Sequence, residues 1–248
     1  MSVRRLAVEQ PEGFAFTPEN HRWAEKQLQK YPEGRQASAV LALLWRAQEQ
    51  MGGWLPEPAL RAVADMLGMA YIRVYEIATF YTMFNLAPVG RYYVQLCGTT
   101  PCWLRGADDI KAVCREMIGE PGHVTADGLF SWTEVECLGA CVNAPMVQIN
   151  KDYYEDLTAE NFAALLGDLK AGRDVKPGPQ VDRQMAAPVG GPKTLTDPDL
   201  YAPKPKGGGD TGQALQDDEA KRPGKAANVR DAAEPKPPVK DESGKKQR

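Results

Sequence analysis

The chain has 248 residues, which is enough for one medium-sized domain or two small ones with hydrophobic cores. Its formal net charge is −3, without the basic excess typical of nucleic-acid-binding proteins, so we expect no nucleic-acid partner. The longest apolar run, ASAVLALLW at residues 37–45, is well below the roughly 20 residues of a membrane-spanning helix, so no direct membrane insertion is expected.

The N-terminal third of the sequence predicts helices. Residues 1–16 are assigned to an N-terminal extension, which lacks the apolar segment of a signal peptide and so predicts a cytoplasmic chain. Residues 17–88 are predicted to form a small helical bundle, with helices at about 18–30, 38–50, 58–67 and 72–84. Thr17 and Pro18 are typical of an N-cap and the first helical position, and Gly68 of a helix C-terminus.

The middle of the chain mixes strands and helices. Residues 89–172 contain predicted strands at 91–96, 129–136 and 146–150, and DYYEDL (152–157) is predicted to close a hairpin with the last of these. Helices are predicted at 103–118 and from 159 onward, the second capped by Thr158. The order β-α-β-β-α predicts a compact α/β layer structure.

The remaining residues, 173–248, are predicted to form an extended or disordered tail. From residue 202 onward the sequence has no aromatic residue, Ile, Met or Cys, and its larger aliphatic residues are only Leu215, Val229 and Val239. Such a segment buries too little apolar surface to offset the entropy of ordering the chain.

Cys114 differs from the other four cysteines in its surroundings. On the predicted helix at 103–118 it shares one face with apolar residues, namely Leu104, Ala107, Ile110 and Met117. A cysteine on such a face is usually a buried and unreactive core residue. We therefore expect no ligand role for Cys114.

The other four cysteines form two pairs, each directly after a predicted strand. Cys97 and Cys102 have four residues between them, Cys137 and Cys141 have three, and 34 residues separate the pairs. If the two strands are neighbours, both loops lie at one end of the sheet and the four sulfurs converge. These gaps are wider than the two-residue gaps of most structural zinc sites, and they suit a [2Fe–2S] cluster held by four thiolates.

Three other interpretations of the four cysteines remain open at this point. A structural zinc site with four cysteine ligands is possible on spacing alone. A thiol–disulfide oxidoreductase usually has the pattern C-x-x-C, which is absent here. A disulfide fits poorly with a reducing cytoplasm. Near the pairs, Thr100 is predicted to be an N-cap with Pro101 at the first helical position, and Gly98 and Gly139 are predicted to let backbone amides approach the sulfurs.

Four stretches together identify a family. YPEGRQASAVLALLWRAQEQMGGWLP, VYEIATFYTMF, PVGRYYVQLCGTTPCWLRGA and ECLGACVNAPMVQIN closely resemble the 24-kDa, E-type subunits of respiratory complex I, NADH:quinone oxidoreductase. The resemblance covers about residues 17–172. The long tail lies outside it.

The resemblance implies a fold and a cofactor. It implies an α+β chain in which the helical bundle precedes a thioredoxin-like domain with one [2Fe–2S] cluster, whose ligands are Cys97, Cys102, Cys137 and Cys141. It also implies that FMN and NADH bind to a 51-kDa, F-type partner, that a G-type iron–sulfur subunit lies in the same complex, and that this chain is not catalytic alone. The expected location is the peripheral arm, on the cytoplasmic side of the membrane or the matrix side in mitochondria. Chains of this type also occur in NAD-linked hydrogenases and formate dehydrogenases.

Overall fold

The computed structural model describes residues 4–191 and 193–200, and the chain divides into two units, residues 1–192 and 193–248. The described part of the second unit contains one short 3-10 helix, η3 (Pro198–Leu200). Residues 1–3 of the predicted extension and residues 201–248 of the predicted tail lie outside the described residues. No helix in the described ranges has both the length and the apolar character needed to cross a membrane.

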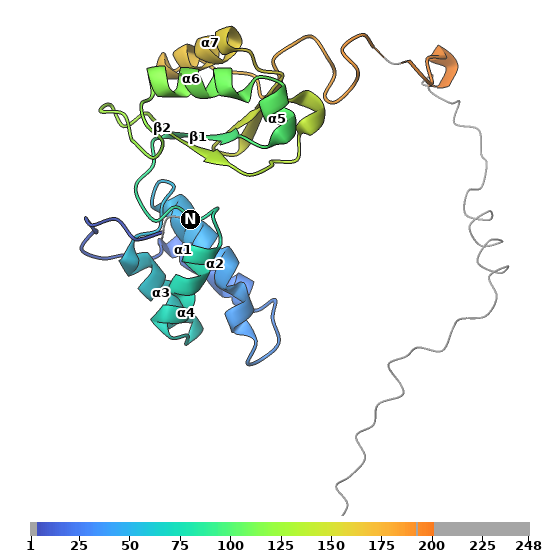
Figure 1. Ribbon diagram of the computed structural model, residues 1–248. Helices are drawn as coiled ribbons and strands as arrows, with labels where there is room; N and C mark the ends of the chain where they lie inside the picture. Colours follow the sequence, from blue (N-terminus) through green and yellow to red (C-terminus); the bar gives the residue numbers. More distant parts are fainter. Residues whose placement is uncertain (1–3, 192, 201–248) are drawn as a thin grey trace, which may run out of the picture. The chain divides into compact units, whose positions relative to one another are not determined.

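The four predicted helices of the N-terminal part are confirmed (Figure 1). They are α1 (Pro18–Leu28), α2 (Val40–Gln50), preceded by the 3-10 helix η1 (Gln36–Ala39), α3 (Glu57–Leu67) and α4 (Tyr71–Phe80). The Thr17 hydroxyl accepts a hydrogen bond from the Asn20 N–H at 3.2 Å, and Gly68 ends α3 with a φ of 61°. The caps predicted from the sequence are therefore present. The buried core between these helices includes Leu43, Leu44, Leu55, Leu60, Val63 and Phe84.

Helix α4 ends about one turn before the predicted residue 84. The Arg4 guanidinium donates to the carbonyl oxygens of Thr79 and Tyr81, both at 3.1 Å, and to that of Phe84. The last carbonyl groups of a helix have no partner within the helix. A side chain from residue 4 supplies partners here, which local sequence around α4 does not reveal.

The second part of the chain is a five-stranded sheet in the order β2-β1-β3-β4-β5. Its strands are β1 (Tyr92–Cys97), β2 (Phe130–Val135), β3 (Val147–Ile149), β4 (Asp152–Glu155) and β5 (Gly178–Pro179). Strand β1 pairs in parallel with β2, β3 is antiparallel to both β1 and β4, and β5 is parallel to β4. Helices α6 (Ala107–Met117) and α7 (Ala159–Lys170) lie side by side on one face of the sheet (Figure 1).

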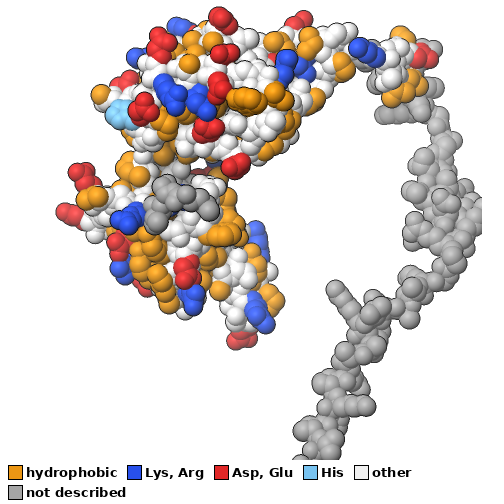
Figure 2. Space-filling view, in the orientation of Figure 1, with side chains coloured by type: hydrophobic (Ala, Val, Ile, Leu, Met, Phe, Trp, Pro, Cys, Tyr) orange, Lys and Arg blue, Asp and Glu red, His pale blue; other side chains and the backbone are white. Residues whose placement is uncertain are grey.

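The core of this α/β part lies between the sheet and the two helices. Its buried members include Val94, Leu96, Ile110, Cys114, Trp132, Phe162 and Leu166. Thr158 and Asn161 form a reciprocal capping box at the start of α7. On the face shown in Figure 2, acidic and basic side chains are interspersed over this part, in keeping with the small net charge.

The helix predicted at 103–118 is in fact two helices, α5 (Thr100–Leu104) and α6. They are separated at Gly106, whose φ of 102° is accessible to glycine and strained for other residues. Because of this break Leu104 is exposed, and Met117 is exposed as well, whereas Ile110 and Cys114 are buried. The single apolar face predicted for this segment was therefore wrong at Leu104 and Met117.

The segment predicted to begin the tail, from residue 173, continues the fold for a short distance. Strand β5 extends the sheet next to β4, and the Gln180 N–H donates to the Glu155 carbonyl at 2.9 Å. The first compact unit accordingly runs to residue 192. Strand β5 could not be predicted from the low apolar content of this segment. It needs few apolar residues because it pairs with β4 through its backbone.

Candidate functional site

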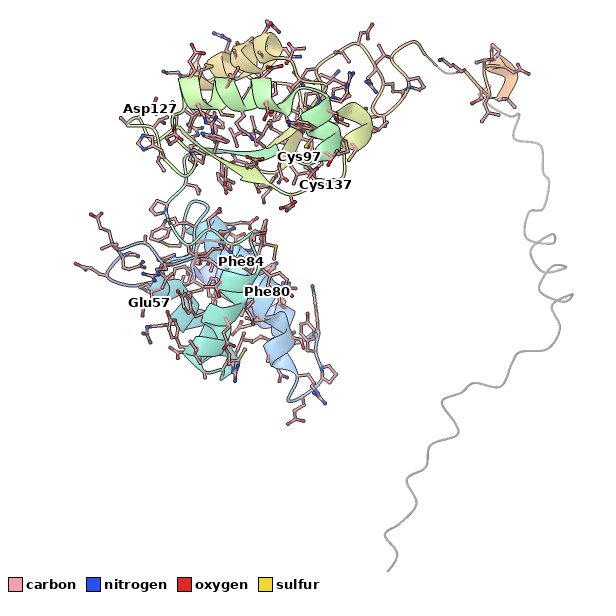
Figure 3. The ribbon with its side chains drawn as sticks, in the orientation of Figure 1. Glu57, Phe80, Phe84, Cys97, Asp127 and Cys137 are labelled. Atoms are coloured by element: carbon pink, nitrogen blue, oxygen red, sulfur yellow. The ribbon has the colours of Figure 1, made fainter. Side chains whose placement is uncertain are left out.

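The parallel pairing of β1 and β2 brings the two cysteine loops together. Cys97 is the last residue of β1 and is in register with Val135, the last residue of β2, so Cys137 follows two residues beyond that strand's end. Figure 3 labels Cys97 and Cys137 and shows them near one another at this end of the sheet. The prediction that the strands are neighbours and that both loops share one end of the sheet is confirmed.

The first pair of cysteines is buried. Cys97 and Cys102 each expose 1% of their surface. Cys102 lies in the first turn of α5, whose N-cap is Thr99, one residue earlier than the predicted Thr100. Burial of this pair keeps water away from two of the four sulfurs.

The second pair is exposed. Cys141 begins the 3-10 helix η2 (Cys141–Asn143), and its sulfur lies 3.6 Å from that of Cys137. A disulfide requires about 2.05 Å, and all five cysteines are free thiols. The Gly139 N–H donates to the Cys137 sulfur at 3.4 Å, as predicted for this glycine. The Gly98 N–H itself donates to the Val135 carbonyl at 3.3 Å, and the amide that approaches a sulfur here is that of the next residue, Thr99, which donates to Cys97.

Hydrogen bonds connect the two loops. The Cys97 sulfur and the Thr99 hydroxyl share a hydrogen bond at 3.3 Å, and the backbone N–H groups of Thr99 and Leu138 also donate to this sulfur. Leu138 belongs to the second loop, and its carbonyl accepts from the Tyr153 hydroxyl at 2.8 Å. The second loop is thus attached both to the first cysteine and to strand β4.

The acidities of the thiols show that the sulfurs influence one another. Burial alone would raise the pKa of Cys97, but hydrogen bonds from Thr99, Leu138 and Cys102 hold it below its ordinary value. Burial raises the pKa of Cys102 to about 12, and the charges of Cys97 and Cys141 add to this. The hydrogen bond with Cys137 raises the pKa of Cys141, and the charges of Cys137 and Cys97 act in the same direction. Positive charge placed among these sulfurs would therefore stabilise their thiolate forms.

Gly98 has a steric role beside the first pair. A Cβ atom at this position would lie 1.9 Å from the Glu134 Oε1 atom of β2. The Glu134 carboxylate is itself paired with Lys111 of α6, with an N–O distance of 2.9 Å. A side chain at Gly98 would therefore require the Glu134 side chain to move and would disturb its ion pair with Lys111.

Cys114 lies away from the site, within the core of the α/β part. It is fully buried on α6, and burial raises its pKa to about 12. A thiol in this environment stays protonated and unreactive. The expectation of a buried core cysteine is confirmed.

Solvent reaches the site from the side of the exposed pair. Cys137 and Leu138 line a groove of about 810 Å³ whose other walls include Tyr93, Gln95 and Gln148 of the sheet. Within the described ranges, no three or more His, Cys, Asp or Glu side chains are spaced to hold a single metal ion. Because Cys97 and Cys102 are buried whereas Cys137 and Cys141 are exposed, the site has one closed side and one open side.

A polar network that is not apparent from the sequence lies beneath the second loop. Asn143, directly after Cys141 and Val142, is buried and contacts residues from β4 and from the segment after β5. The network includes the ion pair of Asp156 and Arg183. No local pattern indicates this network, because its members are separated by up to 42 positions in the sequence.

Comparison with known proteins adds a family and named relatives. Residues 24–170 match the family described as thioredoxin-like [2Fe-2S] ferredoxin. The E 1 subunit of the NADH-quinone oxidoreductase of Rhizobium meliloti (strain 1021) is 57% identical over 205 residues, which cover 80% of this chain and 74% of the relative. The E subunit of the NADH-quinone oxidoreductase of Rickettsia bellii (strain RML369-C) is 57% identical over 158 residues, or 63% of this chain and 95% of the relative. A crystal structure of an NAD+-reducing [NiFe]-hydrogenase in the H2-reduced state aligns with a TM-score of 0.47 and 23% identity, over 55% of this chain and 23% of that chain.

Proposed function

The chain belongs to the thioredoxin-like [2Fe-2S] ferredoxin family, and on that premise we propose that Cys97, Cys102, Cys137 and Cys141 hold one [2Fe–2S] cluster through their thiolates. The observation that carries this proposal is the meeting of the two cysteine loops at one end of the β1–β2 pair. The donor set fits, because four thiolates are the usual ligands of such a cluster. When bound, the cluster supplies a site that accepts and donates one electron at a time.

The chain's own groups prepare the sulfurs for this task. The N–H groups of Thr99 and Leu138 donate to Cys97, and that of Gly139 donates to Cys137. Hydrogen bonds to a thiolate stabilise its negative charge and are among the features that set the reduction potential of an iron–sulfur centre. The buried first pair limits the access of water, whereas the exposed second pair leaves one side open to a partner.

We further propose that the chain is an electron-transfer subunit of an NADH:quinone oxidoreductase. The support is the 57% identity to relatives that are named as E-type subunits of that enzyme. In this assignment the chain exchanges single electrons with FMN on an F-type partner that binds NADH, next to a G-type iron–sulfur subunit. Its location is then the peripheral arm of the complex, on the cytoplasmic side of the membrane or the matrix side in mitochondria.

A flavin on another subunit is needed because NADH delivers two electrons as a hydride, whereas the proposed cluster takes one. The sequence has no G-x-G-x-x-G after a predicted strand and no phosphate-binding loop of the Walker type. We therefore assign no nucleotide or flavin site to this chain.

The test is spectroscopic and uses the purified full chain. We expect a brown protein with about two irons and two acid-labile sulfides, as the cluster's composition requires. Excess NADH alone should leave the visible spectrum unchanged, and a strong chemical reductant should add one electron and produce a paramagnetic signal. NADH should bleach the spectrum only after the flavin subunit is added and only if the cluster's potential is high enough. A colourless chain with one zinc would overturn the cluster assignment, and bleaching by NADH alone would overturn the carrier role.

A further inference from the structure

A segment outside the residues matched to the family packs beneath the second cysteine loop. The family match ends at residue 170, and residues 178–187, here called the C-terminal arm, follow it. The arm begins as strand β5, with Gly178 in register with Tyr154 and Pro179 with Glu155 of β4. This pairing sets the position of the residues that come after it, among them Arg183.

Arg183 joins two elements that are distant in sequence. Its Nη2 atom lies 2.6 Å from the Asp156 Oδ1 atom, and its Nη1 atom donates to the Asn143 Oδ1 atom at 2.8 Å. The side chains of Arg183 and Asp156 are only 9% and 8% exposed. The guanidinium therefore occupies a fixed place between the turn after β4 and the loop that carries Cys141.

Asn143 transmits this contact to the cysteine loop. It is the last residue of η2, the short helix that Cys141 begins, and it is 2% exposed. Its amide nitrogen donates to the Glu155 carboxylate and to the Met185 carbonyl of the arm, the latter at 3.1 Å. Its backbone carbonyl accepts from the Asp156 N–H at 2.8 Å. Each polar group of the Asn143 side chain is thus bonded to the arm or to β4.

The energetics of this ion pair favour a positional role over a stabilising one. Within the described residues the Arg183 Nε and Asp156 Oδ2 atoms are buried without a hydrogen-bond partner. Burial raises the pKa of the Asp156 carboxyl, and the charge of Arg183 opposes this shift. A buried ion pair that is incompletely bonded contributes little net stability, because desolvation offsets the attraction between the charges. Its directional bonds still restrict where Asn143 can lie.

From these contacts we propose that Arg183 is a positioning residue for Cys141, and that the C-terminal arm controls how firmly the second cysteine loop retains the cluster. This rests on the proposed function, since it takes Cys141 to be a ligand. Mutation of a group that orients a metal ligand without contacting the metal typically changes metal affinity by about 10- to 100-fold. Exposed loops need such support, since solvent on one side leaves them few packing contacts.

The experiment measures loss of iron from the reconstituted full chain in excess iron chelator, followed by the visible absorbance. We expect Arg183→Gln to release iron about tenfold faster than wild type. Arg183→Lys should release iron at an intermediate rate, because lysine keeps the positive charge but lacks the planar guanidinium that donates to Asp156 and Asn143 together. The matched control is Arg173→Gln. Arg173 forms an ion pair with Asp168 of α7, lies in the same stretch of chain, and is exposed. It should behave as wild type.

A second measurement separates positioning from general stability. Hydrogen exchange of the Arg183→Gln chain should be faster in residues 137–146 and 178–187 and unchanged in α6 and α7. Equal acceleration throughout the α/β part would overturn the positioning role. So would iron release from Arg183→Gln at the same rate as from wild type and Arg173→Gln. A wild-type chain that takes up no cluster would instead refute the proposed function itself, and this inference with it, so the two failures are distinguishable.

Discussion

Replacing Gly90 with alanine should separate the strands that align the two cysteine loops. Gly90 lies just before β1, and a Cβ atom there would be 2.4 Å from the backbone carbonyl carbon of Phe130 and 2.6 Å from the nitrogen of Ser131 in β2. Carbon atoms in contact prefer about 3.5–4.0 Å, so one strand must move by about 1 Å. The obstructing atoms are backbone, and no change of side-chain rotamer relieves the overlap.

The size of the effect follows from the bonds that such a movement disturbs. The Gly90 N–H donates to the buried Ser131 hydroxyl at 2.8 Å, and the Tyr92 N–H donates to the Leu129 carbonyl at 2.7 Å. A buried polar group left without a partner costs about 1–3 kcal/mol, and overpacking costs about 1–3 kcal/mol more. We therefore expect Gly90→Ala to lower the free energy of unfolding by about 2–6 kcal/mol, and the melting temperature by about 4–24 °C for a domain of this size.

The assay is thermal unfolding of the purified chain, followed by circular dichroism, next to the control Gly167→Ala. Gly167 lies within α7, has an ordinary backbone conformation, and has no atom within 4 Å of a built Cβ. Alanine there should raise stability by about 0.5–1 kcal/mol, because it is the better helix former. A Gly90→Ala chain that melts as late as wild type would show that the strands tolerate a side chain at this point, and the reasoning from close approach would be refuted.

Three further predictions concern the thiols and the end of the chain. Replacing Cys97, Cys102, Cys137 or Cys141 with Ala should remove the cluster's absorbance, whereas Cys114→Ser should retain it at a cost of about 1–3 kcal/mol for the buried hydroxyl, and the reverse pattern would contradict the ligand assignment. Burial raises the pKa of Cys114 to about 12, above about 8.5 for an unfolded thiol. The folded state then keeps a proton that the unfolded state loses, so stability that is fully present below about pH 8.5 falls as the pH rises toward 12. Melting curves at rising pH should show a shallower decline for Cys114→Ala, and an equal slope would exclude this contribution. Finally, ending the chain after Ala202 should leave the melting temperature and iron content unchanged, because almost no core-forming residue is removed; a much lower melting temperature would show that the removed residues belong to the core.

Features encoded by short-range patterns can be predicted from the sequence. The start of α1 is indicated by its N-cap Thr17, and the end of α3 by its C-cap Gly68. The strands β1 and β2 are indicated by their runs of apolar and β-branched residues. Cys97 and Cys137 can be placed because Cys97 ends β1, Cys137 lies two residues after β2, and parallel neighbours end at the same edge of the sheet. The burial of Cys114 follows from helical spacing.

Features set by distant residues cannot be predicted in this way. The carbonyl groups at the end of α4 are bonded by a guanidinium from residue 4, which the sequence around α4 does not reveal. The break before α6 instead has a local cause, the single residue Gly106 within an otherwise helical pattern. The polar composition of the C-terminal arm predicts a tail. Composition is a guide to segments that form their own core, but β5 attaches through backbone hydrogen bonds and Arg183 through an ion pair, and neither needs apolar side chains.

The contrast between the two cysteine pairs explains why the second loop needs polar anchors. The first pair lies within apolar surroundings that include Ala107, Ala144 and Met146, so close packing restricts Cys97 and Cys102 in addition to the hydrogen bonds at Cys97. The second pair must stay exposed if a partner is to exchange electrons through it, and an exposed loop has packing on one side only. Hydrogen bonds from the groups beneath the loop then have to restrict its backbone. The Tyr153 hydroxyl donates to the Leu138 carbonyl at one end of the loop, and Arg183 donates to the Asn143 side chain at the other. A loop held in this way can present its sulfurs to a partner while its backbone stays fixed.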